Sequence, residues 1–303
     1  MRYDARLNAD DHQFTRDELS AAMREADIVL CTLTDDLSRP TLEAARGGRC
    51  RLLANFGVGF NHVDLAAAKE MEVAVTNTPG VLTEDTADHT LLLILTVARR
   101  AGEGERELRA GQWTGWRPTH LLGSRVSGKT LGIIGFGRIG RAVALRAHNG
   151  FGMKILYHSR TPADSATEQT TGASRSDSLE SLLQQSDFIS LHCPATPETH
   201  HLINETRLRH MPPHAFLVNT SRGDVVDERA LVAALDDKRI AGAALDVFEG
   251  EPRVNPRLLN RENVVLLPHL GSATMESRVA MGRRVIANID AFVTQRPLPD
   301  RIA

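Results

Sequence analysis

Three side chains that could take part in chemistry each follow an apolar run of the sequence. His269 follows residues 264–267, Arg222 follows residues 215–218, and Glu251 follows a third such run. Each run is typical of a buried strand, and the carboxyl ends of parallel strands lie at one edge of a sheet, where ligands bind. We therefore expect an imidazole, a guanidinium and a carboxylate to form a reaction centre at that edge.

These residue types suit proton transfer to or from a substrate that carries a carboxylate. His269 is the candidate proton donor because imidazole titrates near physiological pH. Arg222 can bind a carboxylate through two parallel N–H bonds and stabilise the developing oxyanion. Glu251 would stabilise the protonated imidazole, and Glu249 is an alternative for this role. Singly, each residue also has an ordinary explanation, as a turn histidine or a surface charge.

A glycine loop indicates a nucleotide cofactor. Gly135, Gly137 and Gly140 have the G-x-G-x-x-G spacing and lie between an apolar run and a helix-like segment. Glycines at these positions allow a tight turn, a close approach of the backbone to a pyrophosphate, and packing of helix on strand. The helix that begins near Arg138 and Ile139 would offer N–H groups to the phosphates.

The residues after the next predicted strand indicate which dinucleotide binds. An acidic residue normally binds the ribose 2′-hydroxyl at this point, about twenty residues after the loop. The chain instead has Ser159 and Arg160, and a hydroxyl with a guanidinium suits a 2′-phosphate. We expect a preference for NADP(H). NAD(H) remains possible if Arg160 is only a solvated loop residue.

The alternation of short apolar runs and helix-like segments predicts an α/β fold with parallel sheets. We expect two doubly wound domains, with a Rossmann dinucleotide-binding domain inserted in a smaller, flavodoxin-like substrate domain. The predicted parts are residues 1–98 with a hinge helix at 84–98, residues 99–272 for the Rossmann domain, and residues 273–303 returning to the first domain. The Ser/Thr-rich stretch 161–178 is predicted to be a mobile surface connection.

Predicted strands and helices follow from the same alternation. In the first domain we expect strands at 27–32, 51–55 and 73–76, and helices near 16–26, 41–46 and 65–70. In the Rossmann domain we expect six strands, at 131–135, 154–158, 188–192, 215–219, 241–247 and 264–267. The apolar segment 84–100 is expected to be buried between domains or subunits, which favours a homodimer.

Composition and charge exclude several classes of function. The 303 residues are 42% hydrophobic and 24% charged with a net charge of −2, which is ordinary for a globular protein and argues against nucleic acid as a partner. The longest apolar stretch is far shorter than the ~20 residues that span a bilayer, so we expect no membrane association. The cysteines lack metal-ligand spacing, and we expect free thiols in the cytoplasm and no metal.

The ordered motifs resemble the D-2-hydroxyacid dehydrogenase family, and within it the bacterial glyoxylate/hydroxypyruvate reductases. The motifs that carry the resemblance are Asn55–Asp64, Thr76–Gly80, the glycine loop, His192–Pro194, Asn219–Gly223, Leu245–Pro252 and Pro268–Ser272. The resemblance implies that a small 2-oxo acid, glyoxylate or hydroxypyruvate, is reduced to the D-2-hydroxy acid. It places Arg222, Glu251 and His269 at the catalytic positions.

The resemblance also assigns binding residues. Backbone N–H groups of Val58 and Gly59 would meet the substrate carboxylate together with Arg222, and Asp246 would hold the nicotinamide carboxamide. Trp116, in the segment 113–123, would reach a neighbouring active site; alternatively, Trp113 and Trp116 only bury area in a dimer interface. Further cofactor contacts are expected at His192, Pro194, Thr199, Thr220, His269 and Gly271.

Members of this family usually begin with a further strand and helix, so the first domain appears N-terminally shortened. Other functions remain open: a D-lactate-type dehydrogenase, a phosphite dehydrogenase, a formate dehydrogenase, a non-catalytic NAD(P)-binding sensor, or an inactive paralogue. Formate dehydrogenases of the family carry Gln where Glu251 stands, which disfavours that activity. The complete set of Arg222, Glu251 and His269 favours turnover over a sensor.

Overall fold

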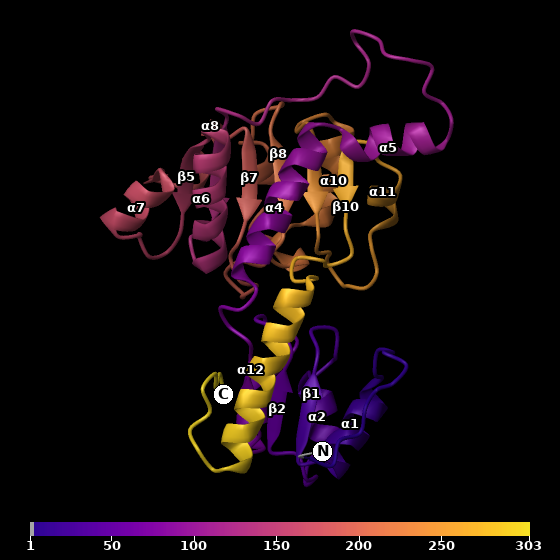
Figure 1. The fold of residues 1–303 in the computed structure, drawn as a ribbon, viewed down its shortest axis with the longest axis vertical. Helices are drawn as coiled ribbons and strands as arrows, with labels where there is room; N and C mark the ends of the chain where they lie inside the picture. Colours follow the sequence, from indigo (N-terminus) through magenta and orange to yellow (C-terminus); the bar gives the residue numbers. More distant parts are fainter. Residues whose placement is uncertain (1–2) are drawn as a thin grey trace. The chain divides into compact units, whose positions relative to one another are not determined.

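The computed structural model describes residues 3–303 and divides the chain into two compact units. Unit 1 combines the residues up to Val81 with Arg278–Ala303, and unit 2 is Leu82–Ser277. Figure 1 follows the chain through both units by colour. Unit 1 is therefore built from the two ends of the chain, and unit 2 from its middle.

Unit 1 contains a three-stranded parallel sheet in the order β1-β2-β3, which follows the chain without a change of direction. The reversal of strand order that is expected in a doubly wound sheet occurs in unit 2, between β7 and β4. The elements of unit 1 are α1 (Arg16–Glu25), β1 (Ile28–Cys31), α2 (Arg39–Ala44), β2 (Leu52–Asn55), α3 (Leu65–Glu70), β3 (Ala74–Thr76) and most of α12 (Met275–Val293).

Local signals in the sequence explain where the helices of unit 1 begin. Thr15 and Glu18 form a capping box at the start of α1, and Asp64 caps α3 by accepting the N–H of Ala67, which satisfies N–H groups that the helix itself leaves unpaired. Helix α12 places Val285 against Leu52 and Ala54 of β2. The return of the chain to the first unit thus covers one face of its sheet.

Unit 2 contains a seven-stranded parallel sheet in the order β10-β9-β8-β7-β4-β5-β6. The strand order changes direction at β4 and β7, which is the arrangement that binds dinucleotides at a Rossmann switch point. Its strands are β4 (Thr130–Ile134), β5 (Lys154–His158), β6 (Ala173–Arg175), β7 (Phe188–Leu191), β8 (Phe216–Asn219), β9 (Gly242–Leu245) and β10 (Val264–Leu266).

Helices cover both faces of this sheet (Figure 1). Helices α4 and α6 pack on one face in a common core with Leu131 and Ile133 of β4. Helices α8 and α10 contribute to the core on the other face. The helices of unit 2 are α4 (Thr83–Ala98), α5 (Ala101–Arg109), α6 (Arg138–Phe151), α7 (Ser165–Thr171), α8 (Leu179–Gln185), α9 (Glu205–Leu208), α10 (Glu228–Asp236), α11 (Pro256–Leu259) and the 3₁₀ turn η1 (Gly223–Val225).

Two expectations from the sequence need correction. The stretch 161–178 is not an irregular connection: it contains α7, which Asp164 caps and Gly172 ends in a left-handed conformation, and β6, which pairs with β5. The boundary between the units lies before α4 rather than after residue 98. The reason is that Leu93 and Ile94 of α4 are buried in the core of unit 2.

Helix α4 also differs in part from the expectation of a helix buried all round. Leu93 and Ile94 are fully buried, whereas 51% of Leu92 is exposed in the single chain.

Among residues 3–303, no helix is long and apolar enough to cross a membrane.

The buried carboxylate of Asp300 gives a test of the packing of unit 1. Its side chain is 2% exposed and accepts hydrogen bonds from Arg284 and Asn288 at 2.5–2.8 Å. Asp300→Ala removes an acceptor from the buried amide of Asn288, so we expect the free energy of unfolding to fall by about 1–3 kcal/mol. The guanidinium of Arg284 is 42% exposed and can be hydrated in the variant. Denaturant unfolding measures this change.

The control is Asp236→Ala in unit 2, because Asp236 also forms ion pairs with arginine side chains, those of Arg257 and Arg261, but is 41% exposed. Exposed ion pairs contribute about 0–1 kcal/mol, so this variant should lose little stability. Equal losses in the two variants would contradict the role given to burial.

Candidate active site

The imidazole of His269 and the carboxylate of Glu251 form a hydrogen-bonded pair at the carboxyl edge of the unit 2 sheet. His269 Nδ1 lies 2.9 Å from Glu251 Oε2. Because a carboxylate only accepts hydrogen bonds, Nδ1 carries a hydrogen and donates it. The second oxygen, Glu251 Oε1, accepts the N–H of Phe248 at 2.9 Å. The carboxylate is thus held at both oxygens, and Nε2 is the ring nitrogen that remains for chemistry.

Glu249, the alternative partner considered from the sequence, is engaged elsewhere. Its Oε1 lies 2.9 Å from Nε2 of His201, and its backbone N–H donates to Glu228. Tertiary structure therefore distinguishes two glutamates that lie two positions apart in the sequence, and Glu251 is the one that contacts His269.

Arg222 lies in the loop that follows β8. The amide of Asn219 holds its backbone carbonyl, and Nη1 donates to the carbonyl of Ser221 at 2.5 Å. Burial lowers the pKa of the Arg222 guanidinium, and the negative charges of Glu251 and Asp224 oppose that effect. A desolvated cation near a His and Glu pair is suited to bind an anionic substrate.

The loop that carries His269 is held by Asp246, at the end of β9. The backbone carbonyl of Asp246 accepts the N–H of His269 at 2.8 Å, and its carboxylate accepts the N–H groups of Leu270 and Gly271 at 2.7 and 2.9 Å. His269 itself has a left-handed backbone, with φ of 54°. This conformation is uncommon outside glycine and marks local strain at a candidate functional residue.

The glycine loop has the geometry of a dinucleotide site. Gly135 has φ of 93°, and a Cβ on it would lie 2.5 Å from the backbone nitrogen of Cys193. At Gly140 a Cβ would lie 2.3 Å from the carbonyl oxygen of Gly135, whereas at Gly137 it would meet open space. Gly137 is the N-cap of α6 and caps it with no side chain, so the N–H groups at the start of α6, near Arg138 and Ile139, remain for phosphates.

Ser159 and Arg160 follow β5, as the sequence indicates. Arg160 is exposed, and the hydroxyl of Ser159 donates to the carbonyl of Thr161 at 2.5 Å. A second guanidinium is close to this turn, because Arg175 Nη2 donates to the carbonyl of Ser159 at 3.3 Å. Arg175 ends β6, so it was missed when residues 161–178 were taken for a connection. The hydroxyl and two guanidinium groups suit a phosphate.

The segment after β7 contributes three of the expected cofactor residues. His192 Nε2 lies 2.9 Å from the hydroxyl of Ser190. His192 keeps some exposed surface, but the surrounding protein lowers its pKa to about 3 by desolvation, so the imidazole is neutral at physiological pH. Thr199 donates to the carbonyl of Pro194 at 2.6 Å. These contacts shape the segment beside Gly135.

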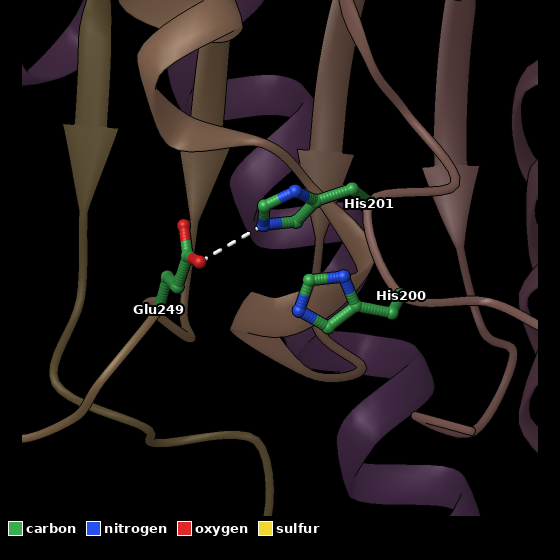
Figure 2. A group of neighbouring side chains, drawn as sticks. All are labelled: His200, His201 and Glu249. Carbon is green, nitrogen blue, oxygen red and sulfur yellow. Dashed lines mark hydrogen bonds and ion pairs between the residues drawn. The ribbon is translucent and has the colours of Figure 1, made fainter. Parts of the chain in front are cut away.

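His200, His201 and Glu249 form a separate group with atoms close enough to ligate a metal ion, all within 4.8 Å of one another. Figure 2 shows the two histidines on one segment, with His201 joined to Glu249. That hydrogen bond already ties the segment after β7 to the segment after β9, and His200 is exposed with its ring against that of His201. His201 and Glu249 therefore link two loops.

The remaining substrate candidates are Val58 and Gly59 in unit 1 and Trp116 in unit 2. The amide of Asn77 donates to the carbonyl of Val58, and that of Asn55 to the carbonyl of Gly59, each at 2.8 Å. The amide of Asn55 also donates to the carbonyl of Gly57, at 3.1 Å. Because C=O and N–H point in opposite directions across a trans peptide, the N–H of Val58 points away from Asn55 and the N–H of Gly59 points away from Asn77. Trp116 is 81% exposed in the segment after α5.

Two polar contacts on α4 were not anticipated from the sequence. His89 Nε2 lies 3.0 Å from Asp246 Oδ1, and the hydroxyl of Thr90 lies 3.0 Å from that of Thr220. The signal that could have revealed them is the polar group at Thr86, His89 and Thr90, which share one face of an apolar helix by their spacing.

Comparison with known proteins places this geometry in a family. Residues 91–271 match the model described as the NAD-binding domain of D-isomer-specific 2-hydroxyacid dehydrogenases. The chain is 48% identical over 294 residues to a glyoxylate reductase of Thermococcus litoralis, covering 96% of this chain and 87% of that protein. It is 40% identical over 290 residues to a glycerate dehydrogenase of Hyphomicrobium methylovorum, covering 96% and 89%.

A solved structure agrees with these relatives. The fold superposes with a TM-score of 0.83 and 38% identity on an NADPH-dependent glyoxylate/hydroxypyruvate reductase from Sinorhizobium meliloti in complex with NADP and malonate, covering 93% of this chain and 86% of that one. The site in unit 2 and these likenesses lead to the same conclusion: the chain belongs to the D-isomer-specific 2-hydroxyacid dehydrogenase family.

Proposed function

We propose that this protein reduces a small 2-oxo acid, glyoxylate or hydroxypyruvate, to the D-2-hydroxy acid. The observation that carries the proposal is the contact between His269 Nδ1 and Glu251 Oε2 at 2.9 Å, in a unit that also provides Arg222 and a glycine loop. The names of the relatives agree with it, since they include glyoxylate reductases and a glycerate dehydrogenase.

The roles of the residues follow from their contacts. When bound, the nicotinamide cofactor supplies a hydride to the carbonyl carbon. Arg222 binds the carboxylate of the substrate and orients the carbonyl group, because a guanidinium forms two parallel bonds to it. His269 Nε2 donates a proton to the carbonyl oxygen as negative charge develops there. Glu251 holds Nδ1–H, which fixes the ring and stabilises its protonated form before the transfer.

NADP(H) is the proposed cofactor, with NAD(H) as the weaker one. The support is the turn after β5, where Ser159 and Arg160 take the place of an acidic residue and Arg175 lies close by. A carboxylate at this position would repel a 2′-phosphate, and a guanidinium attracts it.

A homodimer is the proposed assembly, with Trp116 of one subunit limiting the substrate pocket of the other. The support is a set of exposed apolar side chains on α4, α5 and the following segment, which an interface between two subunits would bury. These residues are Leu92, Leu108, Trp113, Trp116 and Leu122, each more than half exposed. Figure 1 shows the segment after α5 as a long loop that runs out from the helix before β4.

The catalytic proposal is tested by the oxidation of NADPH and NADH with glyoxylate, hydroxypyruvate, pyruvate and phenylpyruvate. We expect turnover of the two smallest polar substrates by the unchanged protein. His269→Ala removes the proton donor and should lower kcat by about 100- to 10,000-fold. NADPH binding, measured by fluorescence, should persist. The control is His214→Ala, an exposed histidine that also contacts a carboxylate, Asp187; unchanged turnover in His269→Ala would exclude the assigned role.

Cofactor preference is tested by charge reversal at the end of β5. Arg160→Glu places a negative charge where the 2′-phosphate is proposed to bind, so the KM for NADPH should rise about 10- to 100-fold, with a smaller change for NADH. Lys154→Glu, at the start of the same strand and also exposed, is the matched control for net charge. A higher kcat/KM for NADH than for NADPH in the unchanged protein would refute the preference.

The pocket proposal is tested at Trp116. Trp116→Ala should raise the kcat/KM for phenylpyruvate relative to glyoxylate, because removal of an aromatic wall admits a bulkier substrate. Leu108→Glu, which should be monomeric by light scattering, should have the same effect on substrate preference. Trp113→Ala is the control within the same segment. If both tryptophan variants change only the oligomeric state, the residues serve the interface alone.

A further inference from the structure

Helix α4 carries three polar side chains on one face, and each reaches a different loop at the carboxyl edge of the unit 2 sheet. Thr90 contacts Thr220 in the loop after β8, His89 contacts Asp246 after β9, and Thr86 donates to the carbonyl of Gly271 after β10. These are the loops that carry Arg222, Asp246 and His269. Helix α4 therefore contacts each of the three loops that follow β8, β9 and β10.

Asp246 is the central acceptor of this arrangement. Its side chain is 1% exposed, and each carboxylate oxygen accepts one backbone N–H, from Leu270 and from Gly271. Its main-chain carbonyl accepts the N–H of His269. The orientation of this one carboxylate consequently sets the path of the chain directly after His269.

His89 is the third group close to the Asp246 carboxylate, but its ring does not form a hydrogen bond with it. Its Nε2 lies 3.0 Å from Asp246 Oδ1, and the His89 side chain is only 10% exposed. The two atoms meet the distance of an ion pair, but the ring is not aligned for a hydrogen bond, so Nε2 is buried without a hydrogen-bond acceptor. A buried polar atom in this state is unfavourable, because it has lost its hydrogen bonds to water without a replacement.

We propose that His89 is a positioning residue for cofactor binding: it aligns with Asp246 and orients that carboxylate for the nicotinamide end of the dinucleotide. The proposal rests on the proposed function for the ligand and on the contacts above for the residue. Asp246 can serve both purposes because a carboxylate has about four acceptor positions, of which two are used by the N–H groups of Leu270 and Gly271.

A purely structural role for His89 predicts different results. If the imidazole only fills space beside α4, its replacement changes stability and weakens every ligand of unit 2 alike. If it orients Asp246, the loss falls on ligands that carry a nicotinamide. The adenine half, expected at the glycine loop, should bind as before.

The test compares binding of NADPH with binding of 2′-phospho-ADP-ribose, which lacks the nicotinamide. His89→Leu should raise the Kd for NADPH about tenfold and leave the Kd for the fragment within about twofold, since a hydrogen bond of this kind is worth about 1–1.5 kcal/mol. His89→Gln, which keeps a donor, should restore most of the NADPH affinity. His148→Leu is the matched control, because His148 is also half-buried on a helix of unit 2 and contacts the carbonyl of Met153.

A second readout needs no cofactor. Hydrogen exchange of the backbone N–H groups of Leu270 and Gly271 should become several-fold faster in His89→Leu than in the unchanged protein or in His148→Leu, because their acceptor is less firmly held. Unchanged exchange together with equal loss of both ligands would overturn the proposal. Faster exchange in a protein that binds neither NADPH nor NADH would uphold the positioning of Asp246 and refute the proposed function instead.

Discussion

Parallel pairing of the strands in unit 2 is the constraint on which the site depends. Because all seven strands run in one direction, the segments after β4, β7, β8, β9 and β10 leave the sheet at the same edge. This common direction brings together residues that lie far apart in the sequence, namely Gly135, Arg222, Asp246 and His269. A reversed or displaced strand would remove its residue from the group.

Buried polar contacts then refine what the sheet brings together. The carboxylates of Asp246 and Asp300 are almost fully enclosed, and both are satisfied by several donors from segments distant in sequence. A buried charge is tolerated only when it is paired in this way. Such contacts require a particular arrangement of loops, so they add specificity to a fold whose stability comes mainly from apolar packing. In unit 2 the arrangement that they specify includes the strained backbone of His269.

The sequence predicted most of the strands because a parallel strand that is buried on both faces is a continuous apolar run. It failed at residues 161–178, where β6 at the edge of the sheet is short and largely exposed and α7 is mostly polar, so neither has an apolar pattern. It also placed the boundary between the units after α4, because an apolar helix alone does not indicate which core covers it. The candidate set of Arg222, Glu251 and His269 could be selected from the sequence, since each residue follows such a run.

The sequence by itself determined the fold class, the position of the glycine loop and the residue types available at the carboxyl edge, because these depend on local periodicity and spacing. Tertiary structure alone decided the partners. It paired Glu251 rather than Glu249 with His269, brought Arg175 to the turn at Ser159, and set His89 against Asp246. The physical reason is that a side-chain contact depends on where two distant backbone segments lie within an ångström or so, and no local pattern records that distance.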